Sequence, residues 1–153
     1  MGNYATVLVG TDGSPSALAA VDRAASLAAA EQALLIVVCV ATPVPAGVSS
    51  AEFGEPRLDQ QVPGADAAVQ ALGSAAERAD LAGVSKVTAV LSEGDPAQAL
   101  LGVARDRGAD CIVVGNRGIN SLSGRLLGSV PADVAYRSPC DVLIVHTDEG
   151  VAE

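Results

Sequence analysis

The chain has 153 residues, half of them apolar, and a formal net charge of −9. This length fits a single domain with a buried core. The acidic charge argues against non-specific binding to nucleic acid or to an anionic membrane, because both need a basic surface. No apolar run approaches the ~20 residues of a membrane-spanning helix, and MGNYATVLVG at the start lacks the basic region and cleavage site of a secretory signal. We therefore expect a cytoplasmic protein without nucleic-acid or membrane partners.

The three cysteines, Cys39, Cys111 and Cys140, lie inside apolar runs without a CxxC spacing. They are expected to be small buried side chains in a reducing compartment. With a single histidine in the chain, we expect no metal site.

Five short apolar runs predict strands. Runs such as LLIVVCV and CIVVG are nearly continuous in Val, Ile and Leu, which is typical of a parallel sheet that helices cover on both faces. The predicted strands are Tyr4 to Gly10, Ala33 to Ala41, Lys86 to Ser92, Ala109 to Gly115, and Asp141 to His146.

Helical patterns separate these strands. Serine or aspartate followed by proline marks two helix starts, since the first residue caps the helix and proline suits its first turn. Four helices are predicted. The first starts at Ser14-Pro15, and the second runs from Ala65 to Ala82. The third runs from Asp95-Pro96 to Gly108, and the fourth from near Ser129 to near Arg137. The alternation predicts one open, doubly wound α/β domain over residues 1–148, followed by a tail at 149–153.

The segment from Thr42 to Gly64 interrupts the alternation. It is rich in proline and glycine, holds the only phenylalanine, and is longer than a routine connection. We expect a flexible loop, either a flap or a disordered excursion.

A glycine-rich loop follows the fourth predicted strand and carries Gly115, Gly118 and Gly128. Such glycines allow a backbone to pass close to a ligand. Ser129 then begins a helix whose unpaired N–H groups and dipole favour an anion. Arg117 lies in the same loop. Alternatively, the glycines only make turns and Ser129 only caps the helix.

The loop after the first strand contains Gly10, Thr11 and Asp12. The Asp12 carboxylate could accept a hydrogen bond from a ribose hydroxyl, as acidic residues do in nucleotide-binding folds. Alternatively, Asp12 makes an Asx-turn with Gly13. Two other nucleotide signatures are absent, since the chain has neither GxxxxGK[ST] nor GxGxxG after the first strand.

Several motifs in order over nearly the whole chain resemble the universal stress protein family. They are VLVGTDGS, Gly94-Asp95-Pro96, ADCIVVGNRG and LLGSVPADVAYRSPCDVLIV. The spacing Gly115-x2-Gly118-x9-Gly128-Ser129 is similar to that of its ATP-binding subgroup, and the chain resembles the small single-domain actinobacterial members. The resemblance implies a Rossmann-like, adenine nucleotide alpha hydrolase-like sheet of order 3-2-1-4-5. It also implies homodimers, for which the strand from Asp141 to His146 is a plausible pairing surface.

The resemblance also implies an adenine nucleotide across the first and fourth strands. Carried over by residue, the base and ribose would meet Gly10, Thr11 and Asp12, and the adenine would also meet Val40. The ribose and first phosphates would meet Gly115, Arg117 and Gly118. The distal phosphates would meet Gly128, Ser129 and Val130. Asn116 and Arg125 complete the expected set of nucleotide contacts.

The expected function is binding of ATP, or of cyclic AMP, by a sensor or regulator of the stress response, and Mg²⁺ could accompany ATP. Two alternatives stay open at this point. One is a slow ATPase or phosphotransferase, which needs a base or water-orienting group at the terminal phosphate. The other is a nucleotide-free dimeric adaptor.

Overall fold

The computed structural model describes residues 3–41, 65–116 and 129–146. Strand and helix alternate throughout these ranges, as predicted, and each strand boundary lies within about two residues of its predicted position. The elements are β1 (Thr6–Gly10), α1 (Pro15–Glu31), β2 (Leu34–Ala41), α2 (Ala65–Ala82), β3 (Val87–Glu93), α3 (Pro96–Arg107), β4 (Cys111–Gly115), α4 (Ser129–Arg137) and β5 (Asp141–Val145).

The five strands form one parallel sheet of order β3-β2-β1-β4-β5, which confirms the expected topology. The chain builds outward from β1 to β2 and β3, then crosses to the other side of β1 to add β4 and β5. Thr6–Gly10 pairs with β2 along its length, and Val7 to Val9 also pair with β4. The direction of winding therefore reverses between β1 and β4.

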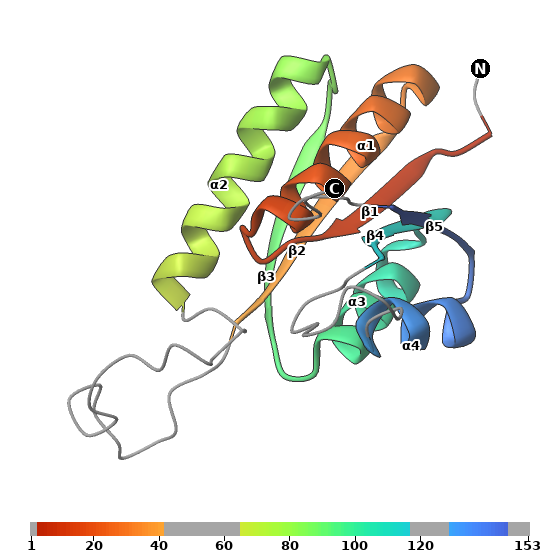
Figure 1. The fold of residues 1–153 in the computed structure, drawn as a ribbon. Coiled ribbons are helices and arrows are strands. Elements are labelled where there is room, and N and C mark those ends of the chain that lie inside the picture. The colour runs from red at the N-terminus through yellow and green to blue at the C-terminus, as the bar shows by residue number, and fades with distance from the viewer. Residues whose placement is uncertain (1–2, 42–64, 117–128, 147–153) are drawn as a thin grey trace, which may run out of the picture.

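Helices α1 and α2 cover one face of the sheet, and α3 and α4 cover the other (Figure 1). Alternation along β1 divides the core accordingly, because successive strand side chains point to opposite faces. Val7 and Val9 pack with α1 and α2, whereas Leu8 packs with α3 and α4. All three side chains are fully buried.

The predicted caps are present at both serine/aspartate–proline sites. Ser14 Oγ accepts a hydrogen bond from the Ala17 N–H at 3.2 Å, and Asp95 Oδ2 accepts one from the Gln98 N–H at 3.0 Å. Gly108 ends α3 with φ of 68°, a left-handed conformation that glycine adopts without strain. The first turns of α1 and α3 are thereby fixed at the carboxyl edge of the sheet.

The cysteine prediction is confirmed for two of the three residues. Cys39 and Cys111 are buried, whereas Cys140 is partly exposed. Burial, with a smaller contribution from the charge of Asp12, raises the pKa of Cys39 to about 11. A thiol that stays protonated is a weak nucleophile, so Cys39 acts as a packing residue.

At the opposite, amino edge of the sheet, Tyr4 joins the start of the chain to β5. The Tyr4 hydroxyl donates to Asp141 Oδ2 at 2.8 Å. This hydrogen bond, followed by burial and the nearby Cys111 and Asp141 charges, raises the pKa of Tyr4 from 10.0 to about 12. The raised pKa means that the protonated phenol is favoured in the folded protein.

We expect this contact to make unfolding sensitive to alkaline pH. Because the folded pKa is raised, the stabilisation is complete below pH 10.0 and disappears as the pH rises through about 12. In a Tyr136→Phe protein, Tyr4 is the only tyrosine, so tyrosinate absorbance reports its titration alone. Adding Asp141→Asn to that variant should lower the pKa of Tyr4, and an unchanged titration would contradict the assignment to Asp141.

No helix in the described ranges is long and apolar enough to cross a membrane. The expected flexible loop at 42–64 and the expected tail at 149–153 lie outside these ranges.

Candidate functional site

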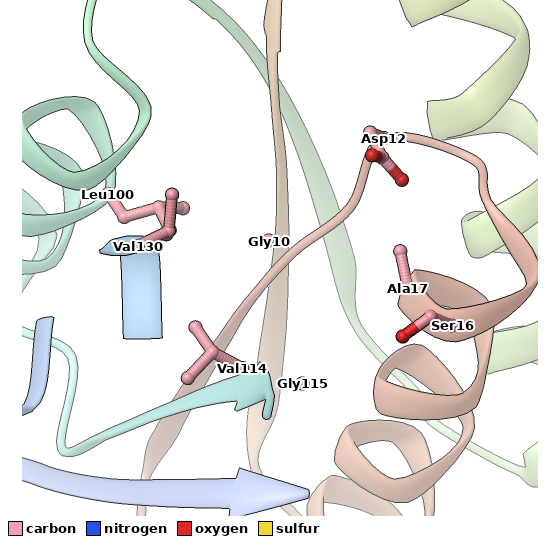
Figure 2. Close-up of a pocket in the computed structure, with 8 residues that line it drawn as sticks. All are labelled: Gly10, Asp12, Ser16, Ala17, Leu100, Val114, Gly115 and Val130. Carbon is pink, nitrogen blue, oxygen red and sulfur yellow. The ribbon is translucent and has the colours of Figure 1, made fainter. Parts of the chain in front are cut away.

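A small hollow opens at the carboxyl ends of β1 and β4, and the space free of atoms there, open solvent included, is about 350 Å³. Figure 2 shows side chains of α1 and the β1 exit on one side, and those of α3 and α4 on the other. The lining residues are Gly10, Asp12, Ser16, Ala17, Leu100, Val114, Gly115 and Val130.

The position of the hollow follows from the topology. Because winding reverses between β1 and β4, the helices that follow these two strands, α1 and α4, lie on opposite faces of the sheet. In open α/β sheets, this point beyond the carboxyl ends of the strands is where ligands bind. The hollow includes Gly10, the last residue of β1, and Gly115, the last residue of β4.

Asp12 makes the turn that the sequence allowed as an alternative. Its Oδ1 accepts a hydrogen bond from the Ser14 N–H at 2.9 Å, which is an Asx-turn. The side chain is half-buried and lines the hollow, and within the described part of the chain its Oδ2 accepts no hydrogen bond. The turn therefore holds the carboxylate in place at the hollow and leaves one oxygen able to accept from a ligand.

The neighbours of Asp12 serve the fold. Thr11 is fully buried; its N–H donates to the Val38 carbonyl at 2.9 Å, and its Oγ1 accepts from the Gly13 N–H at 3.0 Å. Gly13 has φ of 84°, and a Cβ there would lie 3.2 Å from the Ala71 Cβ. Both conditions favour glycine. Thr11 does not line the hollow, so its contact with a nucleotide stays a prediction.

Gly10 brings the backbone of β1 against Leu100 of α3. A Cβ at Gly10 would lie 3.0 Å from Leu100 Cδ2 and 3.1 Å from Cδ1. Leu100 is itself 1% exposed, so this close approach forms the apolar wall of the hollow. The lack of a side chain at Gly10 therefore leaves room for Leu100 and keeps the hollow open.

The first turn of α1 supplies Ser16 and Ala17, two lining residues that were not predicted from the sequence. Figure 2 shows the Ser16 hydroxyl directed toward the space beside Gly115. Leu100 and Val114 were also missed as site residues. The signal for Ser16 and Ala17 was available, because a helix that begins within a few residues of a strand end must place its first turn beside that end.

The exit of β4 is held by β5. The Asn116 N–H donates to the Val145 carbonyl at 2.8 Å, and Asn116 Nδ2 lies 3.3 Å from His146 Nδ1. Asn116 does not line the hollow, although it follows Gly115 directly. Its expected contact with a nucleotide stays a prediction.

Helix α4 begins at Ser129 and places Val130 in the hollow. The start of a helix offers backbone N–H groups that lack partners within the helix. The remaining predicted phosphate contacts, Arg117, Gly118, Arg125 and Gly128, lie outside the described residues.

Val40, the predicted adenine contact, is 1% exposed and packs in the core beneath α3 and α4. It does not line the hollow. Asp12 is the only charged side chain among the lining residues that the structure describes. Within the same residues, no group of three or more His, Cys, Asp or Glu side chains could hold a metal ion.

A sequence profile of the universal stress protein family matches residues 3–146. The chain belongs to the universal stress protein family. The match includes all nine elements that the structure describes, so the family extends over the sheet, both helical layers and the hollow.

Among universal stress proteins, the chain is 44% identical over 147 residues to Rv1636 of Mycobacterium tuberculosis, covering 96% of this chain and 99% of that protein. It is 35% identical over 143 residues to a universal stress protein of Thermus aquaticus, covering 94% and 99%. A crystal structure of a universal stress protein in complex with cAMP superposes with a TM-score of 0.70 at 42% identity, covering 94% of this chain and 97% of that one.

Proposed function

We propose that this universal stress protein binds an adenine nucleotide, cyclic AMP or ATP, in the hollow between β1 and β4 and acts as a nucleotide sensor or regulator in the stress response. The observation that carries the proposal is the meeting of four predicted site residues around one hollow. These residues, Gly10, Asp12, Gly115 and Val130, come from three separate parts of the chain.

The lining fits the chemistry of a nucleotide. Leu100, Val114 and Val130 give an apolar wall for a base, and Asp12 Oδ2 gives an acceptor for a ribose hydroxyl. Gly115 allows backbone to approach the ligand, and the start of α4 favours a phosphate. Arg117, Gly118, Arg125, Gly128 and Ser129 would complete the phosphate contacts, in the spacing of the ATP-binding subgroup.

The relative that was crystallised with cAMP supports the ligand class, since it shares 42% of its residues and covers nearly the whole chain. ATP, with Mg²⁺ where a triphosphate is bound, is the second ligand to test. The net charge of −9 does not oppose this, because salt screens charges beyond a Debye length of ~8 Å while hydrogen bonds to charged groups contribute about 1.5–3 kcal/mol each.

The proposal includes a homodimer formed through the strand from Asp141 to His146. β5 is an edge strand that pairs with β4, and its middle residues Val142, Leu143 and Ile144 are only half-buried. Apolar edge strands are usually covered by another element or chain. Sedimentation of the purified protein gives the direct measurement.

Nucleotide binding can be detected without a label. The chain has no tryptophan and two tyrosines, so copurified adenine would dominate its near-ultraviolet absorbance and would be released on denaturation. Calorimetry with cyclic AMP, ATP and ADP then gives the affinities. Absence of heat with all three, in a folded protein, would overturn the proposed function.

Asp12→Asn tests the ribose contact. Asparagine also makes Asx-turns, so the hydrogen bond from the Ser14 N–H and the fold should persist. Loss of the charged acceptor should weaken binding of a ribonucleotide by about 10-fold or more, because hydrogen bonds to charged groups contribute roughly 1.5–3 kcal/mol. Binding of the 2′-deoxy analogue, which lacks the ribose 2′-hydroxyl, should change much less. An equal loss of affinity for both ligands would place Asp12 away from the 2′-hydroxyl.

A further inference from the structure

His146 and Asn116 extend the pairing of β4 with β5 beyond the ends of both strands. The last paired residues are Gly115 and Val145. One step further, the Asn116 N–H donates to the Val145 carbonyl at 2.8 Å, and Asn116 Nδ2 lies 3.3 Å from His146 Nδ1. Two successive contacts therefore hold Asn116 to the end of β5.

These contacts matter because of the residue that precedes Asn116. Gly115 lines the hollow, and it has no side chain whose packing could fix its backbone. Glycine is also the residue with the greatest backbone freedom. Strand pairing holds the Gly115–Asn116 peptide through its N–H, and the contact between the Asn116 side chain and His146 is a second restraint on the same peptide.

We propose that His146 is a positioning residue for nucleotide binding, acting through the Asn116 side chain to fix the Gly115–Asn116 peptide at the border of the hollow. The inference rests on the proposed function for its effect on affinity. Neither Asn116 nor His146 lines the hollow itself, so His146 influences the ligand through its neighbour.

The donor and acceptor of the contact between Asn116 and His146 determine which substitutions test it. An amide nitrogen only donates, so His146 Nδ1 accepts from Asn116 Nδ2 and the ring proton lies on Nε2. His146→Phe keeps an aromatic ring and removes the acceptor. His146→Asn places a carbonyl oxygen near the position of Nδ1 and restores an acceptor.

The first test measures the affinity for cyclic AMP and ATP by calorimetry, with each variant at the same oligomeric state by size-exclusion chromatography. His146→Phe should bind about 3- to 10-fold more weakly, the effect of one ordinary hydrogen bond. His146→Asn should stay within about 2-fold of the wild type. In an Asn116→Ala background, His146→Phe should have no further effect, because the two residues act as a unit. Equal losses in His146→Phe and His146→Asn, or additive losses with Asn116→Ala, would overturn the proposal.

The second test uses the protein without ligand, which separates this inference from the proposed function. His146 is the only histidine, so its ring nitrogen signals in NMR spectra are unambiguous and should show the Nε2–H form. The Asn116 amide should exchange with solvent faster in His146→Phe than in the wild type or His146→Asn. If the wild type binds no adenine nucleotide, the proposed function is wrong, yet these signals still decide the positioning role. Unchanged Gly115 and Asn116 amides in His146→Phe would refute it.

Discussion

Gly10→Val should abolish most nucleotide binding while leaving the protein folded. A Cβ at Gly10 already lies 3.0 Å from Leu100 Cδ2, and valine adds two methyl groups beyond it. Leu100 is packed on its other sides, so its side chain or the valine must move into the hollow that both residues line. Overpacking of this kind costs roughly 1–3 kcal/mol. A ligand would have to displace these crowded side chains from the hollow, so its affinity should fall about 10- to 100-fold. Calorimetry with cyclic AMP and ATP measures this loss.

Gly73→Val is the matched control for this variant. Gly73 lies on α2 with no atom within 4 Å of an added Cβ, and it faces solvent. The same substitution there should leave affinity unchanged and should change stability only through helix propensity, by well under about 1 kcal/mol in favour of valine. If Gly10→Val remains folded and binds as tightly as Gly73→Val, the hollow is not the nucleotide site.

The elements were predictable because local signals and tertiary packing agree in this chain. Nearly continuous apolar runs such as Leu34–Ala41 must be buried on both faces, and the structure buries that strand on both sides of the sheet. Ser14-Pro15 and Asp95-Pro96 predicted helix starts for reasons of hydrogen bonding and fixed φ, and both caps are present. The strand order was expected from family resemblance, since periodicity carries no information on which strands are neighbours.

Residues of the candidate site could be predicted from the sequence only where the backbone conformation favours a particular residue type. Gly10 and Gly115 stand at strand ends beside the winding reversal, and Asp12 makes a turn that aims its carboxylate. Leu100 was missed because nothing in the sequence near it separates a wall of a hollow from an ordinary core leucine. Only the packing of α3 against the end of β1 makes that difference.

Val40 shows that the surroundings of a side chain near a strand end cannot be predicted from its position in the sequence. Its expected contact with adenine came from the family resemblance; the side chain is 1% exposed and belongs to the core beneath α3 and α4, and the contact itself stays a prediction. A strand end predicts proximity to the carboxyl edge of the sheet, and burial of the side chain depends on which helix covers it. Thr11 is similar, since its hydroxyl is used by the Gly13 N–H within its own turn.

Leu100→Ala should produce the largest loss of stability among these variants. Leu100 lies on α3, and its side chain is 1% exposed in the core that α3 and α4 form with the sheet. Truncation of a buried leucine typically costs about 2–5 kcal/mol, a large fraction of the ~5–15 kcal/mol that stabilises a domain. Leu81→Ala, at a side chain 84% exposed on α2, should change the free energy of unfolding by less than about 0.5 kcal/mol. Denaturant unfolding measures both, and similar values for the two would contradict the packing of α3 described above.

The double variant Gly10→Val/Leu100→Ala connects the two predictions. The nearest atoms to a Cβ at Gly10 all belong to Leu100, so the space that alanine vacates is the space that valine needs. The double variant should therefore be more stable than the sum of the single losses predicts, by about 0.5–3 kcal/mol for residues in direct contact. Nucleotide affinity should recover in part, because the valine can then occupy the wall and leave the hollow open. Additive losses would mean that Gly10 and Leu100 do not share this space, and the close approach of β1 to α3 would no longer explain the glycine at the end of β1.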